Sequence, residues 1–359
     1  MNAAGDFWER ASGNLTTRQR TIALAVVFVV SMAGALAFVK PINTFDFDNI
    51  SHGMGYLLRG MNPYWSLDKY QFYFPPWSVV FLWPLAFLNV GWMVALDVAI
   101  WIIYVLARGK PTALLLLIHP LFILLIASGN SEIVGLVFGI WLVQSNLKGW
   151  PRGVALLLLT IKFQTVFLLI LLEGVRILLD RDWQAVAVIG AVAIPTIVIF
   201  PQWIPNYFVN PAGAWGYPFS VIGTGGVLAA LAFTALILLV MRRRLDEWRT
   251  MAIFLSLVWT PYVLPFSFIA IFIPLARAKW WRVLAFLGGS IALLPFFFQK
   301  FHYLEREGTI LMLALALLLC ERDAEQTEYA VAERYGKQYP WLRLIGRVAP
   351  PPAEVSPAP

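Results

Sequence analysis

Charged residues are scarce in this sequence. Only 13% of the 359 residues are Asp, Glu, Lys or Arg, whereas a soluble domain usually carries about 25%. Hydrophobic residues make up 60% of the chain, and the mean hydropathy is +0.73. A soluble core of this length cannot hide so much apolar surface, so we expect lipid to cover the excess. The shortage of charge therefore excludes an ordinary soluble domain.

Other features are also missing. Cys320 is the only cysteine, which excludes an intrachain disulfide. The sequence contains no Walker motif, no glycine-rich nucleotide loop and no cluster with zinc-ligand spacing. It has no internal repeat of the kind that builds paired-repeat transporters. These absences exclude cytoplasmic nucleotide chemistry and argue against a repeat transporter.

Long apolar runs fill most of the chain. The first, at 21–39, carries no charge and would form a helix about 28 Å long, so we interpret it as a retained membrane span rather than a cleaved signal. The pattern predicts an all-α, polytopic transmembrane protein with about a dozen crossings. Several runs are short, and we expect half-helices broken at polar points such as Lys162 and 261–265. The further runs lie at 90–107, 112–128, 131–145, 153–162, 163–178, 184–201, 221–241, 250–262, 263–277, 281–298 and 309–320.

The basic residues indicate an orientation. The net charge is +7, and these residues gather in short connections at 108–110, 148–152, 176–181, 242–249 and 277–282. This pattern places those connections and both termini in the cytoplasm, provided that 76–88 does not cross, and makes nucleic acid an unexpected partner. We therefore predict a cytoplasmic segment at 1–20, a membrane domain at 21–320 and a cytoplasmic tail at 321–359 that is disordered at its end. A bacterial plasma membrane is the expected location.

The opposite face receives most of the unusual polar residues, at 40–76, 129–132, 162–164, 202–220 and 299–308. In the first of these loops, Asp46 and Asp48 follow the first span directly. Such a pair can coordinate a metal, can supply a base and its orienting partner, or can be two solvated acids. Residues 49–59 predict a short helix that Gly60 can end, and 62–64 predict a turn.

The order of motifs resembles a known family. It runs from Asp46-Phe47-Asp48 through LLRGMNPY at 57–64 to Tyr73-Phe74-Pro75-Pro76, and then to Gly129-Asn130 and IKFQ at 161–164. This order is similar to that of the polyprenol-phosphate-mannose-dependent mannosyltransferases, glycosyltransferase family 87 of the C-type membrane glycosyltransferase superfamily. The resemblance covers about residues 20–180. Residues 49–52 replace the Val-Tyr-Tyr-like stretch of that family, which leaves the sugar open.

The resemblance implies a C-type fold with short extracytoplasmic helices over the membrane. It also implies inverting transfer of a hexose, mannose in that family, from a polyprenyl phosphate to a lipid or glycan acceptor. Asp46 matches the Asp that opens the family's first outer loop, so it is the expected base, with Asp48 as its partner. Because the leaving group is a lipid phosphate, we expect no metal and no cofactor.

The leaving phosphate needs cationic donors. The candidates for that role are Arg59, Lys69, Lys162, His302 and Arg306, and further substrate contacts are expected from Tyr64, Tyr73, Asn130 and Gln164. Simpler roles remain open: Lys162 can extend to the interface, Asn130 can cap a helix, and His302 can be a packing residue.

Other functions also remain open. A transporter or flippase of a lipid-linked saccharide would show paired charges along a path through the membrane. A catalytically inactive accessory membrane protein would not need the two outer acids. An enzyme for a glucose- or arabinose-linked donor would differ only in the sugar.

Overall fold

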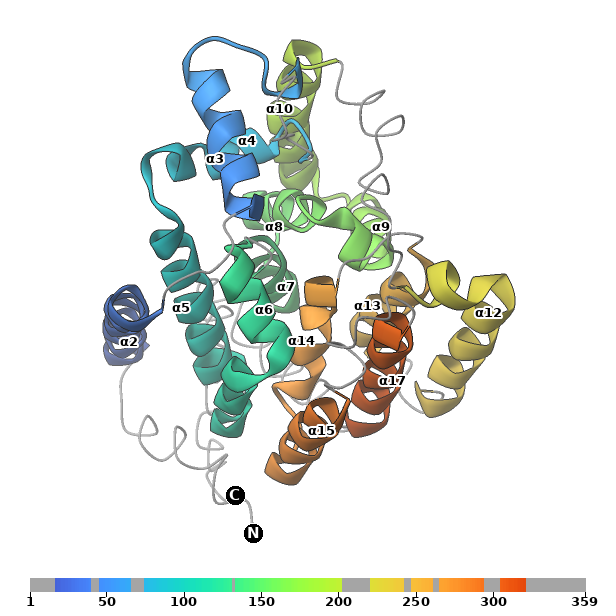
Figure 1. Cartoon of the computed structure of the whole chain (residues 1–359). Helices are drawn as coiled ribbons and strands as arrows, with labels where there is room; N and C mark the ends of the chain where they lie inside the picture. Colours follow the sequence, from blue (N-terminus) through green and yellow to red (C-terminus); the bar gives the residue numbers. More distant parts are fainter. Residues whose placement is uncertain are drawn as a thin grey trace, which may run out of the picture.

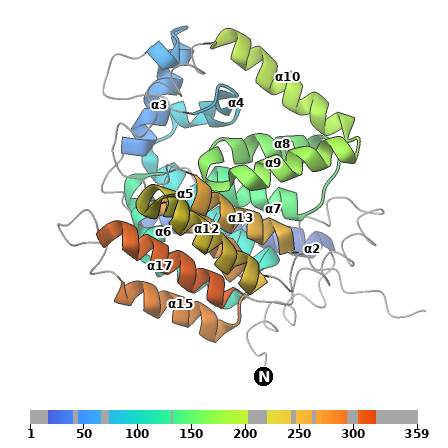
Figure 2. The same cartoon turned by 90° about the vertical axis from the view of Figure 1, so that its right-hand side faces the viewer.

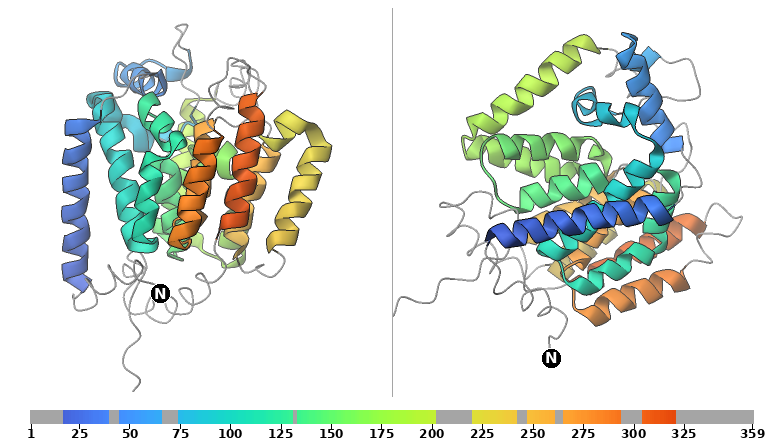
Figure 3. Two further views of the ribbon diagram at one scale, coloured as in Figure 1. Left: turned by 60° about the horizontal axis from the view of Figure 1, so that its bottom comes forward. Right: turned by 90° about the vertical axis from the view of Figure 1, so that its left-hand side faces the viewer.

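The computed structural model describes residues 17–39, 45–65, 74–130, 133–201, 220–241, 247–260, 265–293 and 304–320. Throughout this part of the chain the regular elements are helices, without a strand, so the all-α prediction is confirmed there. Several helices run roughly parallel, and short helices lie across one end of this bundle (Figures 1 and 3). We call that end, where α3 (Phe45–Leu58) lies, the α3 end.

Three helices are long and apolar enough to cross a membrane: α2 (Thr17–Phe38), α5 (Val90–Arg108) and α12 (Val221–Met241). A fourth candidate is the pair η3 (Pro111–Ile118) and α6 (Pro120–Ser128), which bends by 61°. The shorter apolar helices are Ile133–Gln144, Trp183–Ile199, Trp248–Trp259 and Ile310–Leu319. The described residues thus hold three to four candidate spans, and the expected dozen crossings stays a prediction.

Burial separates a central helix from peripheral ones. In α5, 61% of the apolar window is buried, against 11% in α2 and 17% in α12. Trp101 of α5 lies at the centre of an aromatic core, with ring centroids 6.3 Å from Phe122 and 5.9 Å from Phe272. The exposed faces of α2 and α12 carry large apolar side chains, including Val29, Val30 and Leu228. Such faces are suited to contact with lipid.

The predicted break at Lys162 is present. Helix α8 (Trp150–Thr160) ends just before it and α9 (Phe163–Leu179) begins just after it, with φ −124° and ψ 52° at Lys162 itself. Helix α10 (Trp183–Ile199) packs on α8, from which it slants away in Figure 2. Residues 133–144 form one apolar helix, in which a π-helical turn, Ile133–Val137, leads into α7 (Phe138–Gln144).

The remaining helices complete the bundle. Helix α12 packs on α13 (Trp248–Trp259), and α15 (Trp280–Ala292) packs on α17 (Leu304–Leu319). Between α13 and α15, η7 (Pro265–Ile271) and α14 (Phe272–Leu275) supply buried apolar residues. Residues 261–264, where a break was expected, lie outside the described part of the chain.

Short elements form the α3 end. The segment 76–88, which the orientation required not to cross, contains only α4 (Ser78–Leu82) and η2 (Trp83–Phe87), each too short for a span. Helix α3 begins at Phe45 rather than at residue 49, so Asp46 and Asp48 lie within its first turns. Acidic residues are favoured there by the helix dipole. The helix ends as predicted at Gly60, whose φ is +72°.

Candidate functional site

Helix α3 presents two different faces. Phe47, Ile50 and Met54 are buried against the bundle. Asp48 is only half-buried, and His52 and Arg59, which follow it at helical spacing, are exposed. Positions 46 and 48 are two residues apart and so do not face each other on a helix. The two candidate acids therefore occupy different faces of α3, although the side chain of Asp46 lies outside the described part.

Gly129 brings the end of α6 against the acidic motif. This residue caps α6 in the left-handed conformation, with φ +61°. A Cβ atom there would lie 2.5 Å from Cγ2 of Val90 and 3.2 Å from Cβ of Phe47, so only glycine permits the approach. Asn130 follows and is 1% exposed. The structure thus places Gly129-Asn130 beside the residue that separates Asp46 from Asp48.

Lys162 contacts the loop that follows α3. It is 8% exposed, and its Nζ atom lies 5.4 Å from the centroid of the Phe74 ring. Two residues earlier, at the end of α8, the hydroxyl of Thr160 accepts a hydrogen bond of 2.7 Å from Nε1 of Trp77. These contacts hold the start of the α4 segment on the break between α8 and α9. Burial against an aromatic ring differs from the simpler expectation that Lys162 extends into water.

Tyr64 connects the same loop to two further segments. It lies in η1 (Pro63–Trp65), and its hydroxyl donates a 2.6 Å hydrogen bond to the carbonyl of Phe74. Burial raises the pKa of Tyr64, so the phenol stays protonated and remains a donor. Its ring centroid lies 5.8 Å from that of Phe200, directly after α10. The turn predicted at 62–64 is present, since the amide of Tyr64 donates to Oδ1 of Asn62.

Gln164, two residues after Lys162, contacts α13 through its backbone. Its carbonyl accepts a 2.5 Å hydrogen bond from the hydroxyl of Thr260, at the end of α13. By contrast, the described contacts of Arg59 stay within its own helix: Nε donates to the Gly55 carbonyl, and the guanidinium lies over the Tyr56 ring. The structure therefore gathers Tyr64, Asn130, Lys162 and Gln164 at the α3 end and leaves Arg59 at its rim.

Several predicted site residues are not placed. Lys69, Tyr73 and His302 lie outside the described residues, and for Arg306 in α17 only the backbone is described. Within the described ranges, His, Cys, Asp and Glu side chains form no group of three that could hold a metal ion.

The sequence analysis missed a polar residue beside the acids. Asn49 is 4% exposed, and its Oδ1 atom has no hydrogen-bond partner among the described residues. Ser78 in α4 and Thr165 in α9 also have buried hydroxyls without a partner in that part of the chain. Buried polar groups are usually satisfied, so each such group requires an explanation. The signal was the departure of residues 49–52 from the family pattern.

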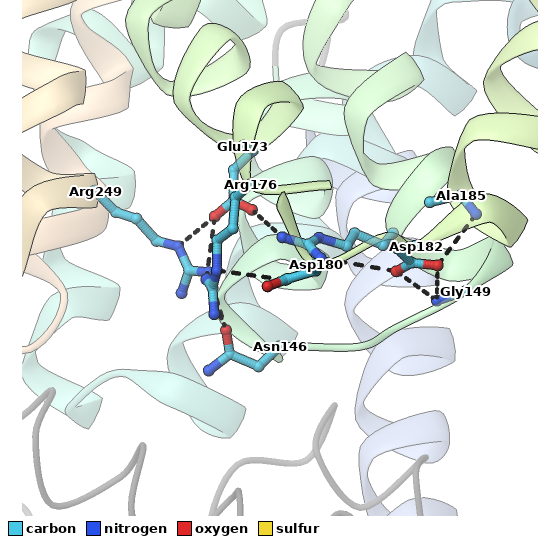
Figure 4. Close-up of polar contacts among 9 residues, drawn as sticks. Asn146, Gly149, Glu173, Arg176, Asp180, Asp182, Ala185 and Arg249 are labelled. Carbon is cyan, nitrogen blue, oxygen red and sulfur yellow. Dashed lines mark hydrogen bonds and ion pairs between the residues drawn. The ribbon is translucent and has the colours of Figure 1, made fainter. Parts of the chain in front are cut away.

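A buried ionic cluster at the opposite end was also missed. Glu173 is 2% exposed and accepts from Nε of Arg249 at 2.7 Å and from a terminal nitrogen of Arg152 at 3.4 Å. Figure 4 shows the cluster extending to Asp180 and Asp182. The hydrogen bond from Arg152 lowers the pKa of Asp180. We call this group the ionic cluster; its members are Asn146, Gly149, Arg152, Glu173, Arg176, Asp180, Asp182 and Arg249.

The ionic cluster connects helix ends. Asp182 caps α10 through the amide of Ala185 and also accepts from the amide of Gly149, just before α8. The ion pairs of Arg152 and Arg249 with Glu173 connect α9 to the start of α8 and to the start of α13. The cluster is therefore a structural clamp on four helices at the end away from α3.

Comparison with known proteins adds no relative: no family model, no curated protein and no solved structure matches this chain.

Proposed function

We propose that this chain is a multispanning membrane glycosyltransferase that moves a hexose from a polyprenyl phosphate to a lipid or glycan acceptor. Mannose is the first candidate sugar, because it is the sugar of the family that the motifs resemble. One observation carries the proposal. Motifs that are far apart in the sequence lie together at the α3 end: Gly129 lies against Phe47, and Lys162 lies over Phe74.

The proposed reaction uses one carboxylate of α3. An acceptor hydroxyl oxygen attacks the anomeric carbon, the bond from that carbon to the phosphate oxygen breaks, and the configuration inverts. Asp46 takes the hydroxyl proton, and a base positioned in this way typically contributes about 10²–10⁴-fold in rate. We assign this role to Asp46 because it matches the Asp that opens the first outer loop of the family that the motifs resemble, whereas Asp48 shares a face of α3 with exposed His52 and Arg59.

Lys162 is the proposed partner of the leaving phosphate. Its ammonium is buried beside Phe74, and an interaction between charges is stronger there than in water. Tyr64, held on the same loop, and Asn130 are proposed to position the donor or the acceptor. The polyprenyl chain would lie in the bilayer, which the exposed apolar helix faces are suited to contact.

The proposed orientation places the α3 end outside the cell and the ionic cluster at the cytoplasmic side. The described basic connections follow α5 and α9 and precede α8 and α15, at helix ends away from α3 (Figure 1). This arrangement supports the orientation expected from the distribution of Lys and Arg in a bacterial plasma membrane.

The main alternative function is that of a transporter or flippase of a lipid-linked saccharide. A transporter would need paired charges along the middle of the bundle. Instead, the described ion pairs belong to the ionic cluster, at helix ends.

The experiment that tests the proposed function is a donor panel. The full chain is purified into lipid and given polyprenyl phosphates that carry labelled mannose, glucose or arabinose, together with a crude lipid acceptor extract. We expect one donor to be consumed, with its label appearing in a new lipid or glycan product. If all three donors remain intact in the presence of the extract, the proposal is wrong.

A further inference from the structure

Two turns at the end opposite α3 form a cluster of basic residues. The turn after α5 contains Arg108 and Lys110, and the turn before α15 contains Arg277 and Lys279, with Arg282 in the first turn of α15. The amide of Lys110 donates a 2.7 Å hydrogen bond to the carbonyl of Ala276. A Cβ atom on Gly109 would lie only 2.9 Å from that oxygen. The turns are thus in direct contact, and we call the five basic residues the cationic cluster.

Acidic residues are missing from the surrounding sequence. Neither 98–130 nor 265–293 contains an Asp or a Glu. Arg108 donates a 2.8 Å hydrogen bond to the hydroxyl of Ser145. Arg282 donates a 3.0 Å hydrogen bond to the backbone carbonyl of Cys320. The N-terminus of α15 adds a partial positive charge to the same place.

The surface beside the cationic cluster is suited to a membrane interface. Trp280 and Trp281 directly follow Lys279 and are 54% and 47% exposed. The guanidinium of Arg282 lies 5.2 Å from the centroid of the Trp281 ring. Farther along α15, Leu284 and Ile291 expose apolar side chains. Tryptophan beside Lys and Arg is typical of the headgroup region, where each ring keeps its apolar part in lipid and its polar edge wet.

We propose that the cationic cluster binds the phosphate headgroups of anionic phospholipids in the leaflet that faces this end. Lys279 is exposed and Arg282 lies beside the Trp281 ring, so these two cations are placed to meet a phosphodiester. The tryptophan pair and the apolar face of α15 favour a headgroup attached to acyl chains over a free phosphate. The inference rests on the membrane placement in the proposed function, and it is independent of the transfer reaction.

The test measures binding of phosphatidylglycerol to the purified full chain, without any sugar donor. The protein is titrated with this lipid in neutral detergent, bound copies are counted by native mass spectrometry, and phosphatidylcholine serves as the neutral reference. Removing a basic residue at an anionic surface weakens binding about fivefold. We therefore expect the double variant Lys279→Gln/Arg282→Gln to bind phosphatidylglycerol about 25-fold more weakly.

The matched control removes two exposed cations from other turns at the same end, in Lys148→Gln/Arg181→Gln. It should bind within twofold of the wild-type protein, and Lys279→Arg/Arg282→Lys should retain binding. The proposal is overturned if both neutral variants lose binding equally, if neither does, or if inorganic phosphate displaces the lipid. It is also overturned if the wild-type protein does not prefer phosphatidylglycerol. Because no donor is present, each of these results is independent of the donor panel.

Discussion

Lys162 and Glu173 are both buried, but their surroundings differ. The ammonium of Lys162 lies over the Phe74 ring at the α3 end, whereas Glu173 lies between the guanidinium groups of Arg152 and Arg249. The negative charge of Glu173 is thus balanced by two arginines of the protein. The Lys162 ammonium lies among the motifs that carry the proposed function. We therefore expect Lys162 to contact the substrate and Glu173 to stabilise the fold.

Replacing Lys162 with Met should remove the proposed phosphate contact while keeping a side chain of similar length. We expect the transfer rate to fall about 10²–10³-fold, as when one donor to a developing charge is removed. The thermal unfolding midpoint of the same variant shows whether a lower rate comes from a damaged fold instead. The transfer rates of the wild-type protein and the variant are measured with the donor that the wild-type protein consumes. Lys162→Arg serves as the control that retains the charge. An unchanged rate in Lys162→Met would exclude a role in the reaction.

Replacing Glu173 with Gln should have the opposite effect. The change removes the carboxylate that pairs with buried Arg249 at 2.7 Å, while Arg152 keeps Asp180 and Asp182, and breaking a buried pair typically costs about 3–5 kcal/mol. We expect a clear fall in the thermal unfolding midpoint in detergent. Asp180→Asn is the control, because the Asp180 side chain is 33% exposed and its removal should matter less. Equal midpoints in the two variants would show that the ionic cluster does not clamp the helices.

Helices α3 and α6 meet through glycine. Gly129→Ala must place a methyl group 2.5 Å from Val90 and 3.2 Å from Phe47, in a left-handed backbone conformation. Gly60→Ala is a matched control, since Gly60 has φ +72° but no neighbour within 4 Å of the added atom. Backbone strain alone typically costs about 1 kcal/mol in both variants. We expect Gly129→Ala to unfold at a lower temperature and also to lose transfer activity, because α3 must shift. Similar behaviour of the two variants would mean that the contact with Phe47 is unimportant.

Some of these elements were predictable from the sequence. A charged residue inside an apolar run predicted the break at Lys162, and Gly60 predicted the end of α3. The bend at His119 was not expected, because the run 112–128 looks continuous. The early start of α3 was missed because Asp46 and Asp48 were assigned to a loop rather than to a helix N-terminus, where acids are favoured.

The candidate site was predictable only in part. The motif order pointed to Asp46, Asp48 and Lys162, but the sequence did not separate the two acids, because their faces depend on where α3 begins. The ionic cluster joins Asn146, Glu173 and Arg249 from different helices. Hydrophobic periodicity reports which side of a helix is buried, and it does not report which charged residues meet across helices.

The whole molecule has two chemically different ends. The α3 end gathers the proposed catalytic motifs, and the opposite end holds the ionic and cationic clusters. We expect these ends to lie on opposite sides of the membrane. In a Cys320→Ser background, single cysteines at the exposed positions His52 and Lys279 provide the test. A maleimide that cannot cross membranes should label His52→Cys in intact cells and Lys279→Cys only after permeabilisation. Labelling of both from one side would contradict the proposed orientation.

The most direct test of the proposed mechanism compares Asp46→Asn with Asp48→Asn in the transfer reaction, using the donor that the wild-type protein consumes. Asp46→Asn keeps the shape of the side chain and removes the base, so turnover should fall about 10²–10⁴-fold. Asp48→Asn should retain most of its turnover, because Asp48 shares a face of α3 with exposed residues. Full turnover by Asp46→Asn would contradict the mechanism, and loss confined to Asp48→Asn would assign the base to the other face of α3.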